Sequence, residues 1–294
     1  MVKRNYTCTG CKKVLTTQGI NSFPNYPCFD CSSIKENTIP HDWKFKGFIF
    51  EEGEEEKYLT ILRNPNLFDN LINELDKKIV DEKASRKVIV LNANGRLVQN
   101  CQVASYNLLI NDDAGTGKDY ITAQTLAIIP KEKSIHKTRI SPAVFTYWHN
   151  SKYEPSWTWD GLIFYGEDIS EAVLNSDVVK VMSSNGSNAT IVIKQRAVDI
   201  EIIGKPVIFV TSASAVPNPE LTRRFMILNL DSSENQTKEI MKRHSEYKQK
   251  GISPNYDQDL IDAQLLLGRI KVKIPYADLI HRNFPIKNII IRSF

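Results

Sequence analysis

The residues best suited to chemistry surround Lys118, in the nine-residue stretch NDDAGTGKD at positions 111–119. The apolar run before it, residues 106–110, is typical of a buried strand, and residues 120–127 after it are typical of a helix. Between a strand and a helix, glycines let backbone N–H groups curl around an anion, while the helix dipole and the lysine add positive charge. This order predicts a phosphate-binding loop, or P-loop.

Two positions of this loop depart from the usual pattern G-x-x-x-x-G-K-[ST]. Asp112 stands where the first glycine belongs, and Asp119 replaces the Ser or Thr whose hydroxyl normally meets magnesium. Asp119 is either a carboxylate ligand of Mg²⁺, directly or through water, or a helix-start residue favoured by the dipole. The alternative for the whole stretch is a Gly-Lys turn that binds no ligand.

Composition and charge set broad limits on the class of protein. The 294 residues are 41% hydrophobic and 24% charged, with a net charge of +4, as in an ordinary globular protein. The mild positive charge permits nucleic-acid binding without requiring it. No apolar run reaches the about 20 residues of a membrane span, and residues 1–6 lack the apolar core of a signal peptide. We therefore expect a cytoplasmic protein with reduced cysteines and no membrane partner.

Four of the five cysteines form two C-x-x-C pairs, Cys8 with Cys11 and Cys28 with Cys31. Each pair can place two thiolates on one turn, and two such turns complete a tetrahedral Zn²⁺ site. Because all four ligands are cysteine, no coordination position stays open, so we expect the zinc to be structural. A disulfide framework is the alternative, which a reducing compartment disfavours.

Composition and hydrophobic pattern divide the chain into four parts. These are a four-cysteine zinc ribbon at residues 1–45, an acidic linker at 46–64, a nucleotide-binding core at 65–232, and a helical lid with the start of a truncated C-terminal region at 233–294. Residues 66–86 have helical periodicity, whereas the β-branched run at 87–91 predicts a strand.

Two carboxylates, Glu167 and Asp168, follow the apolar run at residues 162–165. In an α/β sheet the ligand crevice lies at the carboxyl ends of the strands. Acidic side chains there can hold Mg²⁺ through its waters and polarise an attacking water. The alternative is a strand followed by a helix cap.

A further strand is expected over residues 205–212, with the hydroxyls of Thr211 and Ser212 at its end. These hydroxyls would again lie at the crevice. The arginine pair Arg223-Arg224 then precedes another apolar strand. It is either a surface ion-pair site or a finger directed at a γ-phosphate.

Between these strands, residues 189–194 and 197–202 form two β-rich runs that predict a hairpin. Lys194 and Arg196 make its tip basic. A basic tip is usually only solvated, but it can also contact a phosphate backbone.

In this order, the motifs resemble those of the AAA+ ATPases. The sequence is most similar to the clade with a β-hairpin just before the sensor-1 strand. That clade includes superfamily 3 helicases, minichromosome-maintenance helicases and primase-associated helicases of viruses and mobile elements. The resemblance covers residues 65–294 and lies mainly in WDGLIFYGEDIS, SSNGSNATIVIKQRAVDIEIIGKPVIFVTSAS and ELTRRFMILNLD. It implies an α/β, three-layer P-loop fold with a parallel sheet and an inserted hairpin, to which the zinc ribbon is appended.

The resemblance also implies ATP and Mg²⁺ as cofactors of an ATPase. ATP would lie against Asp113, Ala114, Gly115, Thr116, Gly117, Lys118, Asp119 and Tyr120. Glu167 and Asp168 would be the Walker-B pair in reversed order, and would share Mg²⁺ with Asp119. Thr211 or Ser212 would be sensor 1. Arg224 resembles the arginine finger, with Arg223 as the alternate.

Because such a finger acts on the ATP of a neighbouring subunit, the resemblance implies a ring of identical chains, a hexamer. Lys194 and Arg196 would line its channel and track single-stranded or forked DNA, as in a helicase or translocase that works with a primase or polymerase. One alternative is a AAA+ loader or assembly ATPase that binds ATP without unwinding DNA. Another is a zinc-ribbon interaction protein whose degenerate P-loop binds no nucleotide.

Overall fold

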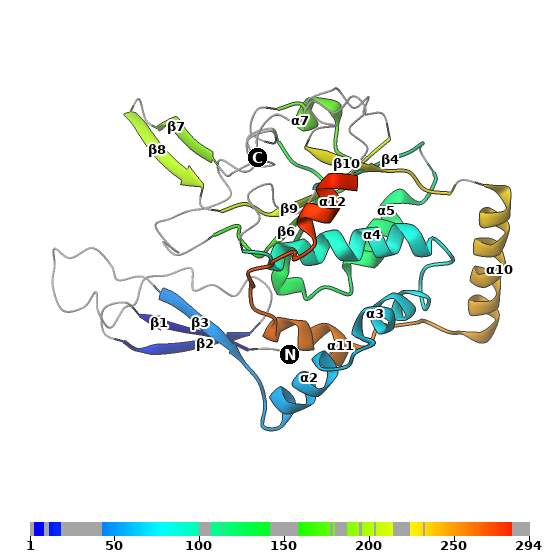
Figure 1. Cartoon of the computed structure of the whole chain (residues 1–294), viewed down its shortest axis with the longest axis horizontal. Helices are drawn as coiled ribbons and strands as arrows, with labels where there is room; N and C mark the ends of the chain where they lie inside the picture. The colour runs from blue at the N-terminus through cyan, green and yellow to red at the C-terminus, as the bar shows by residue number, and fades with distance from the viewer. Residues whose placement is uncertain are drawn as a thin grey trace.

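A parallel sheet with helices on its faces forms the centre of the molecule (Figure 1). The computed structural model describes residues 3–8, 12–18, 43–99, 107–113, 115–141, 158–176, 179, 187–193, 196–202, 204–213, 224–231 and 233–283. The central strands are β4 (Asn107–Asn111), β5 (Ser134–Lys137), β6 (Ile163–Gly166), β9 (Val207–Ser212) and β10 (Phe225–Leu228). The helices are α2 (Glu54–Leu62), α3 (Leu67–Leu75), α4 (Lys83–Asn94), α5 (Lys118–Leu126), α7 (Glu171–Leu174), α10 (Glu234–Lys250), α11 (Gln258–Ala263) and α12 (Ala277–Asn283).

The five central strands lie in the order β10-β4-β9-β6-β5, and every neighbouring pair is parallel. β4, β6 and β9 are short apolar runs that are buried almost throughout, as expected for strands covered on both faces. β9 therefore separates the strand before the P-loop from the strand before the two carboxylates. The α/β fold with a parallel sheet predicted from the sequence is confirmed.

Alternating side chains divide the core into two layers. Leu108 and Ile110 of β4 pack with residues of α3, α4, α5 and α11 on one face of the sheet. Leu109 points to the other face, where it joins Trp159 and the α7 residue Val173. The sheet and its two covering layers give the predicted three-layer arrangement.

The strand predicted at residues 87–91 is wrong, because this run lies inside helix α4. Ser85, Ile89 and Ala93 recur every fourth residue and are all buried, whereas Leu91 is exposed. Packing of this helical face against the core overrides the β-preference of the local residues. The helix predicted over residues 66–86 is also interrupted, since α3 ends at Leu75 and α4 begins at Lys83.

The hairpin predicted before the last two strands is present as β7 (Ser187–Ile193) and β8 (Arg196–Ile202), an antiparallel pair that stands out from the central sheet (Figure 1). The helical lid expected from residue 233 begins with α10, which Ser233 caps at its N-terminus and Gly251 ends in a left-handed conformation.

The N-terminal part contains a second, antiparallel sheet in the order β2-β1-β3, formed by β1 (Lys3–Cys8), β2 (Val14–Gln18) and β3 (Trp43–Ile49). Cys8 is buried at the end of β1. Cys11, Cys28 and Cys31 lie outside the described residues, so the zinc site stays a prediction. The acidic run of the expected linker opens helix α2, with Glu54 in its first turn. The boundaries of the four parts also stay a prediction.

Across the described ranges, no helix has both the length and the apolar character needed to cross a membrane.

Candidate functional site

Three parallel strands end at the same edge of the sheet and bring the predicted site residues together. β4 continues into the P-loop, β9 ends with Thr211 and Ser212, and β6 is followed by Glu167 and Asp168. The last residue of β4, Asn111, pairs with the last residue of β9, Ser212, so these two strands end at the same height in the sheet. At this edge, where the sequence predicts the ligand crevice, the phosphate loop follows β4 on one side of β9 and the two carboxylates follow β6 on its other side.

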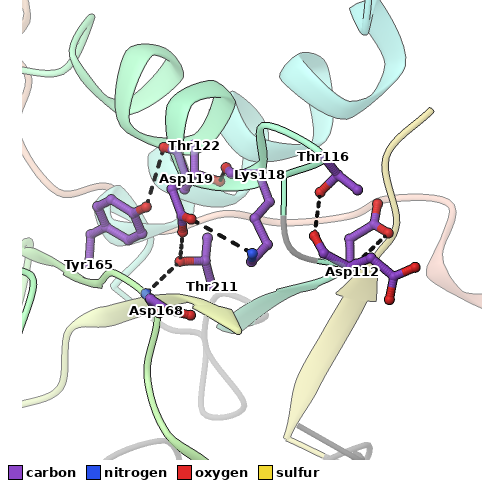
Figure 2. Close-up of polar contacts among 9 residues, drawn as sticks. Asp112, Thr116, Lys118, Asp119, Thr122, Tyr165, Asp168 and Thr211 are labelled. Atoms are coloured by element: carbon purple, nitrogen blue, oxygen red, sulfur yellow. Dashed lines mark hydrogen bonds and ion pairs between the residues drawn. The ribbon is translucent and has the colours of Figure 1, made fainter. Parts of the chain in front are cut away.

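Two glycines of the loop have the backbone conformation expected of a phosphate-binding turn. Gly115 and Gly117 have φ angles of 89° and 83°, in the left-handed region that side-chain-bearing residues rarely adopt. The Thr116 hydroxyl donates to the Asp113 carbonyl at 3.0 Å and closes the turn (Figure 2). Lys118 is the first residue of α5, so the positive end of that helix points into the turn.

Lys118 is only 4% exposed, which is unusual for a lysine. Its Nζ lies 3.7 Å from Oδ2 of Asp119. A buried ammonium group is stable only beside an anion, so Asp119 supplies the negative charge in this state. A nucleotide phosphate would supply it in the bound state.

Thr211 joins the P-loop to the acidic strand end (Figure 2). Its hydroxyl donates to Oδ1 of Asp119 and accepts a hydrogen bond from the backbone N–H of Asp168 at 2.9 Å. The Thr211 carbonyl accepts from the Ile169 N–H at 2.8 Å. One buried hydroxyl on the strand between them thus connects the two halves of the crevice.

Asp168 has a φ angle of 48°, which is strained for a residue with a side chain. Its side chain is exposed. Glu167 instead turns toward β5, where its Oε2 lies 2.9 Å from Nε2 of His136. The two predicted Walker-B carboxylates therefore occupy different surroundings.

Two residues of this site, His136 and Tyr165, were missed by sequence reasoning. Their rings stack with centroids 4.5 Å apart. Burial raises the pKa of Tyr165 well above its ordinary value, so its hydroxyl stays protonated and donates to the Asp119 carbonyl at 3.4 Å. Only their positions in the sequence could have indicated them. His136 lies near the end of β5, and Tyr165 lies two residues before the acidic pair.

A pocket of about 420 Å³ lies between α5 and α10. Tyr120 and Gln124 of α5 and Arg243 and Tyr247 of α10 contribute to its wall, together with Lys78. None of the described residues that line it is acidic. The Gln124 Oε1 atom is buried and has no hydrogen-bond partner within the described part of the chain.

The remaining predicted residues are only partly placed. Arg224 is half-buried directly before β10, and its carbonyl accepts from Nδ2 of Asn107 at 3.3 Å. Arg196 begins β8. Arg223, Lys194 and Ala114 lie outside the described residues, so their predicted roles stay predictions.

The fold and the site together define a P-loop domain of the nucleotide-binding kind. A family model described as the MTBMA_p00010 P-loop domain matches residues 51–266, which is more than half of the chain. The chain therefore belongs to this family. The match runs from α2 to the turn after α11, and so contains every element of the crevice. No curated protein matches the chain.

Proposed function

We propose that the chain is an AAA+-type ATPase that couples ATP hydrolysis to movement along DNA. The observation that carries this proposal is the Thr211 hydroxyl, which contacts both the P-loop Asp119 and the backbone of Asp168. A polar side chain between the phosphate loop and the catalytic carboxylates is placed to respond to the γ-phosphate. The inserted hairpin directly before β9 supports the same assignment.

The donor set fits a magnesium ion bound together with the nucleotide. Among the described residues there is no group of three or more His, Cys, Asp or Glu side chains that could hold a metal ion. Mg²⁺ does not need such a group, because it commonly takes one or two carboxylates, phosphate oxygens and water. Asp119 is half-buried beside Lys118 and would be the carboxylate ligand, with Glu167 and Asp168 near its waters. The ion would neutralise charge developing on the phosphates.

The remaining steps would be shared between Lys118, which would bind phosphate, and the two carboxylates Glu167 and Asp168. Lys118 would bind the β- and γ-phosphates, and the amides of the loop would hold them in place. Glu167, held by His136, would orient the attacking water, while the Asp168 carboxylate would contact the waters of the metal.

The pocket between α5 and α10 suits the adenine base. It begins at Tyr120, two residues after Lys118, so a nucleotide can extend from the loop into it. Tyr120 and Tyr247 offer aromatic faces for packing.

The hairpin and the arginine pair supply the proposed coupling to DNA. In a hexameric ring, Lys194 and Arg196 would contact the backbone of single-stranded or forked DNA. Arg224, or Arg223, would reach the ATP of the neighbouring subunit. A structural Zn²⁺ on Cys8, Cys11, Cys28 and Cys31 would stabilise the N-terminal part, which would be available to a primase or polymerase partner.

ATP hydrolysis measured with and without single-stranded and forked DNA tests the proposal. DNA should raise the rate for the unaltered chain, and changing Lys194 and Arg196 together to Ala should reduce the ratio of stimulated to basal rate to about one. A matched double change, Lys238→Ala with Lys242→Ala on the exposed face of α10, should leave the ratio unchanged. Stimulation that survives the hairpin change would refute the channel role.

A loader or assembly ATPase is the second candidate, and the departures at Asp112 and Asp119 favour it. Strand separation on a forked duplex distinguishes the two, because a loader would hydrolyse ATP without unwinding. A chain with no thermal shift in Mg-ATP would instead fit an interaction protein with a degenerate P-loop.

A further inference from the structure

Asp112, which stands where the usual P-loop has its first glycine, makes contacts that a glycine cannot make. Its Oδ1 accepts a hydrogen bond from the Asp113 N–H at 2.8 Å, inside the loop. Its Oδ2 accepts from the Leu230 N–H at 3.3 Å, just after β10 (Figure 2 shows the carboxylate between the loop and the neighbouring strand). One carboxylate therefore links the phosphate loop to the segment that leads into α10.

That segment is held at several successive points. The Asp231 N–H donates to Oε1 of Glu82 at 2.6 Å, and Glu82 belongs to the start of α4. Oδ1 of Asp231 accepts from the Ser233 N–H at 2.8 Å. Ser233 then caps α10 by accepting from the Gln236 N–H at 3.3 Å. The N-terminal end of α10 is thus positioned by Asp112 on one side and Glu82 on the other.

The rest of α10 is fastened by polar contacts. Gln236 Nε2 donates to the Val80 carbonyl at 2.9 Å, and Arg243 Nη1 donates to the Asp76 carbonyl at 2.6 Å. The Tyr247 hydroxyl donates to the Lys77 carbonyl at 3.0 Å. Breaking such hydrogen bonds costs little net free energy, because water can replace them, whereas exposing a buried apolar face would cost more. Helix α10 is therefore held mainly by contacts that water can replace, and it carries one wall of the pocket beside Tyr120.

We propose that Asp112 is a positioning residue that couples occupancy of the phosphate loop to the position of α10. In the present structure the Asp112 carboxylate is the negatively charged acceptor of the Asp113 N–H. A phosphate bound in the loop brings negative charge to the same amides, so it repels the carboxylate and competes for its donor. The hold on Leu230 then weakens, which frees the N-terminal end of α10. The coupling rests on the proposed nucleotide binding, whereas the link from Asp112 to Leu230 does not.

Amide hydrogen exchange on the full chain tests both parts. Asp112→Ala removes both acceptor oxygens, so neither the Asp113 N–H nor the Leu230 N–H keeps its hydrogen bond to this side chain. Without nucleotide, this change should speed exchange at Leu230 roughly tenfold, as expected for losing a hydrogen bond to a charged group. In the unaltered chain, saturating Mg-ADP should produce a similar increase over residues 226–233. In Asp112→Ala the nucleotide should add nothing further.

Two further variants serve as a second test and a control. Asp112→Gly, which restores the usual P-loop residue, should also lose the nucleotide-dependent change and should bind Mg-ADP several-fold more tightly, because a negative charge beside the phosphates is removed. Glu239→Gln, on the exposed face of α10, removes a charge without touching the link and should exchange like the unaltered chain.

The possible results separate the link to Leu230, the coupling to nucleotide and the proposed function. Unchanged exchange at Leu230 in Asp112→Ala without nucleotide would overturn the link itself. The coupling would be overturned by a different pair of results. These are faster amide exchange at Leu230 in that variant, and unchanged exchange over residues 226–233 of the unaltered chain when calorimetry shows that Mg-ADP is bound. A chain that binds no Mg-ADP would overturn the proposed function together with the coupling, and the nucleotide-free comparison would still decide the link.

Discussion

Replacing Thr211 by Val removes one hydroxyl and keeps the shape and β-preference of the side chain. This hydroxyl is fully buried, with 0% exposure, and it is the only atom through which Asp119 and the Asp168 N–H are joined in the described structure. We expect the change to lower both the stability of the fold and the rate of ATP hydrolysis.

The size of the stability loss follows from the two hydrogen bonds. The bond to the Asp119 carboxylate is to a charged group, worth roughly 1.5–3 kcal/mol, and the bond from the Asp168 N–H is an ordinary one, worth about 0.5–1.5 kcal/mol. Asp119 and Asp168 are both partly accessible, so water can replace some of the lost interaction. We therefore expect a loss of about 2 kcal/mol in the free energy of unfolding.

Thr125→Val is the matched control. Thr125 lies on α5, is only 1% exposed, and its Oγ1 has no hydrogen-bond partner within the described ranges. The same substitution there removes a buried hydroxyl that forms no bond, so stability should stay the same or rise by about 1 kcal/mol. Urea unfolding at pH 7 measures both variants, and steady-state kinetics should show that only Thr211→Val lowers kcat.

Equal effects of the two substitutions on unfolding would refute the reasoning, because the contribution of Thr211 would then not come from its hydrogen bonds. A stable Thr211→Val variant with full kcat would refute its assignment as the link between the loop and the carboxylates.

Three further predictions follow from single residues. Arg96→Met should leave the free energy of unfolding unchanged or raise it by about 1 kcal/mol, because Arg96 is only 4% exposed, burial lowers its pKa to about 10, and Nη1 donates to the Ala93 carbonyl and Asn94 Oδ1 while Nε and Nη2 have no partner within the described chain. A urea titration checks this, and a clear loss of stability would contradict it. Burial, with Glu54 nearby, raises the pKa of Tyr58 to about 12. The unfolded chain therefore loses this proton at lower pH than the folded chain, so stability should fall as pH rises from about 10 to 12, and Tyr58→Phe should reduce that slope. His136→Ala should lower kcat more than it raises KM, because His136 contacts Glu167 and lies outside the phosphate loop. Steady-state kinetics that show the opposite split would exclude that role.

The strands and the loop of the site were predictable because their signals are local. The apolar runs before Lys118, Glu167 and Thr211 are short, bounded by polar residues and buried on both faces, which is the pattern of parallel strands. The turn needs glycines at two left-handed positions, and the sequence supplies Gly115 and Gly117 there. Each feature depends on a few neighbouring residues only.

The remaining parts depend on contacts between distant segments. The run at residues 87–91 has β-branched residues, but tertiary packing of Ile89 and Val90 makes it helical. The contact from His136 to Glu167 requires β5 and β6 to be neighbours, and the sheet order is not encoded in either strand alone. The link from Asp112 to Leu230 joins residues 118 positions apart. No periodicity within a short window contains such information.

The P-loop pattern looks defective at position 119, where Asp replaces the usual Ser or Thr. In the structure the Asp119 carboxylate lies 3.7 Å from Nζ of Lys118 and accepts a hydrogen bond from the Thr211 hydroxyl on β9. The acidic pair Glu167-Asp168 still follows β6 on the other side of β9. Because a carboxylate is itself an oxygen ligand of the kind that Mg²⁺ takes in proteins, the missing Ser or Thr after Lys118 does not by itself count against a nucleotide site.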